Sequence, residues 1–460
     1  MNRIVSSLFV GLLLPSAAFA ASPDFAAARD EAVAALREFI RLDTSNPPGN
    51  ETRGAEFLKR ILDREGIPAE ILALEPARGN VVARLKGSGK RQPLLLMGHI
   101  DVVGVERDKW TVDPFAGVMK DGYVYGRGAV DDKGMTIACL QTMLLLKRLH
   151  VPLDRDAIFL ACAGEEATTH VGIDYMVAKH WDKIACEFAL NEGGRLHEEK
   201  GEVNYVAVAT SEKVPRPFLI SAHGPSGHAS RPIVSNAVVH LAAAVAKVGT
   251  WQAPMRLNAT TREYFRRIAT ISPPEKARML QNLEDPKVQE KLLRAEPGIN
   301  AMLRTTLTPT IMKAGFRINV IPGDGLAQID VRALPDENID ALASELRRVI
   351  DDLQIEVVPP VSPGRPATPP VPIDTEMFAA LERAQRKLFP KAITVPLMTV
   401  GATDSAQLRA KGVKAYGVSP VMNDGDSVRM HGNDERIAIA GLEKFLEFLW
   451  AAVTDVAGAK

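Results

Sequence analysis

Histidine and carboxylate side chains recur at five places along the chain: three directly follow strand-like runs, one precedes a helical pattern, and one lies in a polar loop. These are His99 with Asp101, Asp131 with Asp132, Glu165 with Glu166, Glu192, and His431. Imidazole nitrogens and carboxylate oxygens are the ligands of zinc-like ions, and one carboxylate can bridge two such ions about 3.5–4 Å apart. The residue types therefore suit hydrolysis by a water molecule held between two metal ions.

His99 and Asp101 follow the apolar run Leu94–Met97. Alternate residues on an extended backbone point the same way, so the imidazole could bind a metal while the carboxylate orients its other ring nitrogen. The alternative is a histidine of the core that is satisfied by a neighbouring carboxylate. One such pair is compatible with either interpretation.

Glu165 and Glu166 directly follow the run Ile158–Ala163. Consecutive side chains diverge, so one glutamate could bind a metal while the other serves as a general base. A solvated acidic loop, or acids that favour the start of a helix, would look the same.

Asp131 and Asp132 stand in a glycine-rich bend that lacks the last glycine of a dinucleotide fingerprint. They suit a metal carboxylate, or the N-cap of the helix that follows. Neither HExxH nor GxSxG occurs, which argues against a single-zinc protease helix and a serine hydrolase.

Strands and helices alternate around these residues. The apolar runs before His99 and Glu165 predict strands that are buried on both faces, as in a parallel sheet. Helical patterns follow Ser22-Pro23 and cover about 53–65 and 134–150. An open α/β sheet binds ligands at the carboxyl ends of its strands, where these polar residues lie. We therefore predict an α/β catalytic domain with a helix-covered, mostly parallel sheet.

A second domain interrupts the first. The segment after Lys213 predicts a strand, a helix, two strands, a helix and a strand, which is the order of a ferredoxin-like α+β unit. The expected elements are Phe218–Ala222, Ser235–Val248, Thr310–Val320, Ala327–Val331, Glu337–Leu353 and Ile355–Val358. A helical insertion spans about 257–303, and a proline-rich linker follows residue 358. We expect catalytic parts at 21–213 and 361–460, with a lid domain at 214–360.

Bulk properties limit the partners and the compartment. The 460 residues carry 56 basic and 56 acidic side chains, which argues against a broad nucleic-acid surface. Residues 1–20 have a positive start, an apolar stretch and an Ala-x-Ala end, the pattern of a cleaved signal peptide; a membrane anchor would need a longer span. We therefore expect an exported protein without a stable membrane span. Cys139, Cys162 and Cys186 allow at most one internal disulfide, and free thiols are the simpler expectation.

Five ordered motifs carry a resemblance to a known family. GHIDVVG, GRGAVDDKG, AGEEATTH, LNEGG and HGNDER occur in the order found in the aminoacylase and glutamate carboxypeptidase family of two-zinc amide hydrolases, across essentially the whole mature chain. The resemblance implies that His99 and His431 bind different metals, that Asp131 bridges them, and that Glu166 and Glu192 complete the ligand sets. It further implies that Asp101 supports His99, that Glu165 is the general base, and that the bond between Asp131 and Asp132 is cis.

The same resemblance assigns roles in the lid. His228, in SAHGPSGHASRP, resembles a histidine that reaches a neighbouring active site and stabilises the oxyanion of the scissile carbonyl; it would otherwise be an ordinary turn histidine. Asn319 and Gly401 resemble substrate contacts, although a plain turn also suits Gly401. Arg332 resembles the arginine that pairs with a substrate carboxylate, and an ion pair with Asp330 is the alternative.

The lid insertion resembles the branch with yeast carboxypeptidase S and the secreted N-acyl amino acid hydrolases. That branch implies a small peptide or N-acyl amino acid substrate, two divalent ions with zinc as the best fit, and a homodimer through the lid whose contact the insertion could block or replace. Two other readings remain open: hydrolysis of a different amide or ester, and a non-catalytic binding protein. The binding protein would be expected to lack Glu165 or a ligand, and the chain lacks neither.

Overall fold

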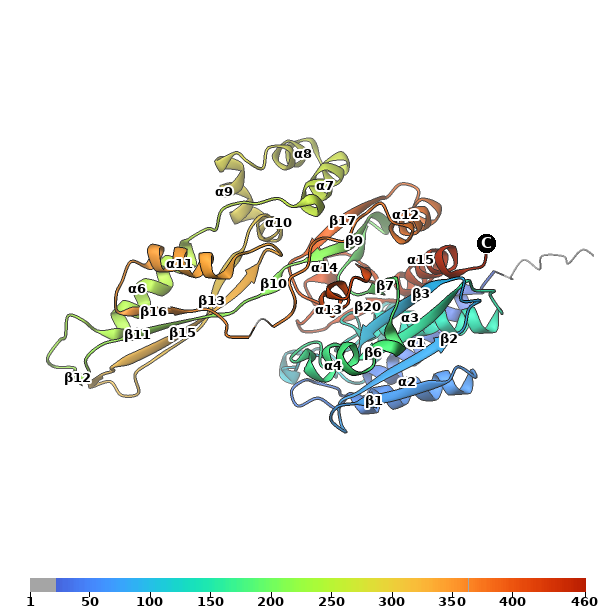
Figure 1. Cartoon of the computed structure of the whole chain (residues 1–460), viewed down its shortest axis with the longest axis horizontal. Helices are drawn as coiled ribbons and strands as arrows, with labels where there is room; N and C mark the ends of the chain where they lie inside the picture. The colour runs from blue at the N-terminus through green and yellow to red at the C-terminus, as the bar shows by residue number, and fades with distance from the viewer. Residues whose placement is uncertain (1–21, 363) are drawn as a thin grey trace, which may run out of the picture.

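The computed structural model describes residues 22–362 and 364–460, so the predicted signal peptide lies outside the described residues. Figure 1 shows an α/β domain that contains the C-terminus and a smaller domain that extends away from it. Within the described ranges, no helix is both long and apolar enough to cross a bilayer. Cys139, Cys162 and Cys186 are free thiols, as expected.

The larger domain is built on a ten-stranded sheet in the order β1-β2-β6-β3-β7-β18-β9-β8-β19, with β17 paired to β9. The central strands β6, β3, β7 and β18 are parallel, whereas β1 and β2 form an antiparallel edge. The strands are β1 (Ala69–Ala73), β2 (Gly79–Leu85), β3 (Arg91–His99), β6 (Arg155–Cys162), β7 (Phe188–Asn191), β8 (Arg195–Glu199), β9 (Glu202–Glu212), β17 (Ile393–Thr399), β18 (Lys414–Gly417) and β19 (Val421–Met422). The predicted helix-covered, mostly parallel sheet is confirmed.

Both faces of this sheet are buried, which explains the unbroken apolar run in β3. Leu94 and Leu96 belong to the core formed with α1, α3 and α15, while Leu95 and Met97 pack with α4 and α13 on the other face. Burying each such side chain contributes roughly 1.5–3 kcal/mol. The helices of the first face are α1 (Phe25–Ile40), α2 (Glu51–Arg64), α3 (Lys133–Arg148), α12 (Glu376–Leu388) and α15 (Ile439–Ala457), and those of the second are α4 (Ile173–Lys179), α5 (Trp181–Ile184) and α13 (Ser405–Ala410).

Short elements complete this domain. A small antiparallel sheet joins β4 (Val118–Lys120), β5 (Tyr123–Tyr125) and β20 (Arg436–Ala438). The remaining short helices are η1 (Arg107–Lys109), η2 (Thr169–Val171) and α14 (Asp424–Ser427). Because β20 pairs with β5, the chain just after His431 is held against the segment that leads to Asp131.

The smaller domain has the predicted ferredoxin-like order. Its strands run β13-β15-β11-β16, all antiparallel, and α6 and α11 cover one face through a shared apolar core. The elements are β10 (Val214–Pro215), β11 (Phe218–His223), α6 (Ala237–Thr250), β13 (Thr306–Ala314), β15 (Asp324–Ala333), α11 (Ile339–Ile350) and β16 (Ile355–Val358).

The predicted C-terminal boundary of one strand in this domain was wrong. The expected strand Thr310–Val320 stops at Ala314, where Gly315 turns the chain with φ +70°. Val320 instead begins β14 (Val320–Ile321), which pairs with β12 (Gly227–His228) at the far end of the lid. Glycine permits this left-handed turn at no steric cost. Apolar residues alternate on both sides of Gly315, so the sequence pattern did not indicate that the strand ends there.

The helical insertion rests on the catalytic domain. It comprises α7 (Ala259–Ile268), η3 (Ala269–Ile271), α8 (Pro274–Gln281), α9 (Pro286–Ala295) and α10 (Pro297–Leu303). Phe265 and Ile268 share an apolar cluster with Val395 and Met398 of β17 and with Tyr205 of β9. Figure 1 shows these helices above the joint between the domains, away from the lid tip at β12.

Candidate active site

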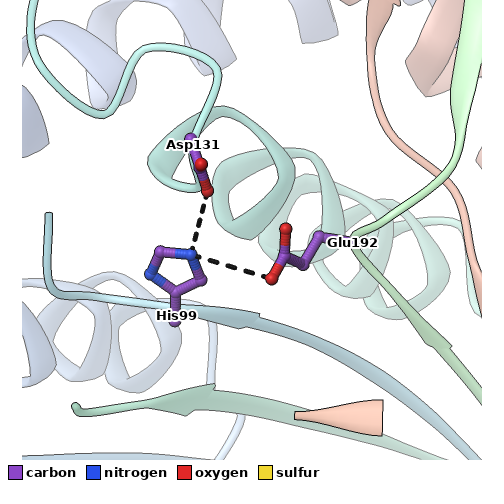
Figure 2. A group of neighbouring side chains, drawn as sticks. All are labelled: His99, Asp131 and Glu192. Carbon is purple, nitrogen blue, oxygen red and sulfur yellow. Dashed lines mark hydrogen bonds and ion pairs between the residues drawn. The ribbon is translucent and has the colours of Figure 1, made fainter. Parts of the chain in front are cut away.

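His99 ends β3 and points toward two carboxylates that are largely buried. Its Nε2 lies 3.1 Å from Asp131 Oδ1 and 4.0 Å from Glu192 Oε1 (Figure 2). Asp131 comes from the loop before α3, and Glu192 directly follows β7, the strand beside β3. The carboxyl edge of the sheet therefore assembles three of the predicted residues.

Asp131 is shared with a second group. Its other oxygen, Oδ2, lies 3.0 Å from His431 Nε2, and that nitrogen is 3.1 Å from Glu166 Oε1. In each group the potential ligand atoms all lie within 4.8 Å of one another. Two histidines and three acids, with one aspartate that presents a different oxygen to each group, fit a pair of zinc-like ions joined by a bridging carboxylate.

The electrostatics of this edge also favour a cation. Burial raises the pKa of Glu192 well above its usual range, and the nearby Asp131 and Glu165 carboxylates add to that rise. Burial likewise raises the pKa of Asp132 well above normal, with repulsion from Asp131 adding to it. Buried carboxylates that repel one another become much more stable beside bound divalent cations.

Asp101 holds His99 and the acidic loop together. The Nδ1 atom of His99 lies 2.9 Å from the Asp101 carbonyl oxygen and 3.6 Å from its carboxylate. The fully buried carboxylate accepts hydrogen bonds from Asn46 Nδ2 at 2.8 Å, Glu165 N at 3.1 Å and Glu166 N at 3.0 Å. Its contacts therefore extend beyond the expected one with the His99 ring.

Asp132 occupies the N-cap position of α3, which is one of the two alternatives considered for it, but its side chain does not cap the helix. The side chain instead accepts a hydrogen bond from His99 N at 3.1 Å. A Cβ atom on Gly98 would lie 2.5 Å from Asp132 Oδ2, so only glycine fits before His99. The peptide bond between Asp131 and Asp132 is cis, as the resemblance implied.

Glu165 lies beside the two ligand groups and belongs to neither. Its side chain is only 8% exposed, and Arg365 donates a hydrogen bond to its Oε1 atom. Burial raises the pKa of Glu165 to about 8, and the Arg365 guanidinium opposes that rise. A carboxylate that lies next to potential metal ligands but is not one of them is suited to proton transfer.

The structure does not bring His228 and Asn319 to this site within one chain. His228 lies in β12 at the lid tip, far from β3 and β7 in Figure 1. Its Nδ1 accepts hydrogen bonds from Ser230 N at 3.1 Å and Ser230 Oγ at 2.8 Å, which leaves Nε2 available. Asn319 is adjacent, because its carbonyl oxygen accepts from Ala229 N at 3.1 Å.

Arg332 and Gly401 also lie outside the ligand groups. Arg332 forms a double ion pair with Asp330, with Nε to Oδ1 at 2.9 Å and Nη2 to Oδ2 at 3.1 Å, which is the alternative considered for it. Gly401 stands in the turn after β17. Thr403, in the same turn, has a methyl group 3.3 Å from where a Cβ on Gly193 would lie, so this turn adjoins the Glu192 segment.

Three supporting residues were missed from the sequence: Asn46, Arg365 and Glu435. The fully buried Glu435 carboxylate accepts from Val130 N at 2.8 Å, Asp131 N at 3.1 Å and Arg127 Nη1 at 2.6 Å. Its place in HGNDER was the only local signal. Asn46 and Arg365 stand in proline-rich segments without a periodic pattern.

This arrangement at the carboxyl edge of the sheet is that of a two-metal hydrolase. A family model described as peptidase family M20/M25/M40 matches residues 95–455, and the chain belongs to this family of metallopeptidases and amidohydrolases. The N-fatty-acyl-amino acid synthase/hydrolase PM20D1 of Xenopus tropicalis is 31% identical over 91% of this chain and 85% of its own. A probable carboxypeptidase S-like 2 of Dictyostelium discoideum is 29% identical over 79% and 72%.

A solved structure supports the fold. The M20 family metallo-carboxypeptidase Sso-CP2 from Sulfolobus solfataricus superposes with a TM-score of 0.72 at 19% identity, covering 92% of this chain and 98% of its own. The predicted family, enzyme class and fold are therefore confirmed.

Proposed function

We propose that this protein is exported and hydrolyses an amide bond next to a free α-carboxylate, releasing an amino acid from an N-acyl amino acid or a peptide. The observation that carries the proposal is the sharing of Asp131 between two groups of potential ligands, with Glu165 beside them and in neither. Export follows from the pattern of residues 1–20.

The two groups of potential metal ligands identify the residues that would hold two divalent ions, and zinc fits these ligand types best. His99, Asp131 and Glu192 would hold one, and Asp131, Glu166 and His431 the other. Such ions, when bound, polarise a carbonyl and make a water molecule more acidic.

Protein groups would carry the remaining steps. Glu165 would take a proton from the attacking water and pass it to the departing nitrogen. His228 from a second copy would donate a hydrogen bond from Nε2 to the developing oxyanion. Arg332 would leave Asp330 and pair with the substrate carboxylate, since its fork already matches a carboxylate in two-point geometry.

The relatives point to two substrate classes that share this chemistry. The names of the Xenopus and Dictyostelium proteins refer to N-fatty-acyl amino acids and to carboxypeptidase activity. In both classes the scissile amide is followed by an α-carboxylate, so one site of this design could process either. Selectivity between them would depend on the acyl side of the substrate.

A substrate panel tests the proposal. N-acyl amino acids, dipeptides and their carboxyl-amidated counterparts would be assayed with the purified protein, with chelator, and after zinc is restored. We expect turnover of the free acids, loss with chelator and recovery with zinc. Glu165→Gln should lower kcat by about 10²–10⁴-fold while retaining metal. Full activity after chelation would contradict the metal mechanism, and equal turnover of amidated substrates would contradict the role of Arg332.

A further inference from the structure

Arg365 is a largely buried arginine in the linker that joins the lid to the catalytic domain. It lies between β16 and α12, in a stretch rich in proline, yet its side chain is only 12% exposed. Its Nη2 donates to the Glu165 carbonyl oxygen at 2.9 Å and also to Glu165 Oε1. One guanidinium nitrogen therefore holds both the backbone and the carboxylate of the same glutamate.

The other end of the guanidinium is fixed as well. Nη1 lies 3.4 Å from Asp404 Oδ1, and Asp404 is almost fully buried. The adjacent Thr403 hydroxyl donates to Glu212 Oε2 at 2.9 Å, and Arg409 pairs with the same oxygen at 2.8 Å. Asp404, the second partner of Arg365, therefore directly follows a residue that belongs to a buried network of hydrogen bonds and ion pairs.

A further contact connects this arginine to the lid. Arg216, on the other crossing between the domains, donates from Nη2 to the Arg365 carbonyl oxygen at 3.0 Å. The Arg216 backbone N–H donates to Val331 O of β15 at 2.8 Å. Hydrogen bonds thus run from the lid sheet through Arg216 and Arg365 to Glu165.

We propose that Arg365 is a positioning residue that fixes the direction of the Glu165 carboxylate and joins it to the segments that carry the lid. The proposal rests on the proposed function, in which Glu165 is the general base. Arg365 engages Oε1, and within the described part of the chain no hydrogen bond involves Oε2, which leaves that oxygen for the attacking water. A base held in one direction reacts faster than one that samples several rotamers.

A direct contact between Arg365 and the substrate would have a different kinetic effect from the proposed positioning of Glu165. The guanidinium already faces two carboxylates of the protein, Glu165 and Asp404, so a substrate carboxylate would have to displace one of them. Loss of a substrate contact raises KM, whereas misplacement of the base lowers kcat. The two roles are therefore separable.

The experiment compares Arg365→Met and Arg365→Lys with a matched control, Arg267→Met. Arg267 also bridges two carboxylates, Glu263 and Glu382, but it lies on the insertion helix α7, on which no candidate site residue stands. We expect Arg365→Met to lower kcat by about 10–100-fold with KM changed less than about twofold. Arg365→Lys should recover part of the rate, and Arg267→Met should retain the full rate.

Hydrogen exchange provides a readout that does not depend on turnover. The backbone N–H groups of Glu165 and Glu166 donate to Asp101, and Arg365 holds the same loop from the other side. We expect Arg365→Met to speed exchange in 164–168 and Arg267→Met to leave it unchanged. Exchange equal to that of the unmodified protein, or a raised KM at unchanged kcat, would overturn the proposal. Should the unmodified protein hydrolyse none of the panel, the proposed function fails, while the exchange comparison still decides the role of Arg365.

Discussion

Asp101 shows how one side chain can support two parts of a site. Its backbone carbonyl and carboxylate face the His99 ring, and its carboxylate oxygens collect three N–H donors from Asn46, Glu165 and Glu166. A carboxylate can accept all three hydrogen bonds, whereas an amide presents two donors of its own. The local hydrogen bonding at this position therefore favours an ionised carboxylate.

Asp101→Asn should lower zinc affinity and kcat by about 10–100-fold, because an amide NH₂ would meet N–H donors and the His99 ring would lose its charged partner. Zinc titration against a competing chelator and steady-state kinetics would measure both effects. Asn46→Ala removes only one of the three donors and should have a smaller effect. Equal behaviour of Asp101→Asn and the unmodified protein would exclude a supporting role for Asp101.

Glu435 holds the backbone of Asp131, the residue shared by the two groups of potential ligands. The Glu435→Gln variant should be less stable by about 3–5 kcal/mol, because the buried Arg127 guanidinium loses its charged partner. Thermal unfolding would measure the loss. Glu443→Gln on α15 is a suitable control, since its pair with Arg29 is partly exposed and should contribute little to stability. A similar small change in both variants would show that the contacts of Glu435 are replaceable.

At the scale of elements, the strand ends could be predicted because their signal is local. The runs that end at Met97, Ala163 and Leu190 lie within a few residues of His99, Glu165 and Glu192, and parallel pairing brings their ends together. Contacts between distant segments could not be predicted in this way. Arg365 and Glu165 are 200 residues apart, and Glu435 and Asp131 are 304 apart, with no shared periodicity to connect them.

The junction of β3 with the α3 loop tolerates no extra atom. A Cβ at position 98 would lie 2.4 Å from Thr136 Oγ1 and 2.5 Å from Asp132 Oδ2. Gly98→Ala should therefore cost about 1–3 kcal/mol in stability and weaken metal binding, as overpacking does. Gly104→Ala, in the same motif but in open space, should leave both unchanged. Thermal unfolding with and without zinc would check this, and equal stability of the two variants would contradict it.

At the scale of the whole molecule, the lid tip at β12 is far from β3 and β7, whose ends carry potential metal ligands, so the proposed role of His228 requires a second copy. A mixture of His228→Ala and Glu165→Gln chains should then recover up to about a quarter of the unmodified activity, because half of the dimers are mixed and each has one intact site. The activity of the mixture after subunit exchange would test this. Activity no greater than the sum of the separate variants would show that His228 does not act across copies.

The insertion changes how the lid is mounted. A domain inserted once in a chain is joined by two strands of backbone, but here the chain leaves the lid after α6, packs α7 on β17, and returns at β13. The lid is thus attached at four places instead of two. A domain joined to its neighbour by two connections can rotate about the axis through them. Each further connection restricts that rotation. Closure of this lid should therefore bend the segments 251–258 and 304–305 as well as the two outer crossings, and its travel should be short.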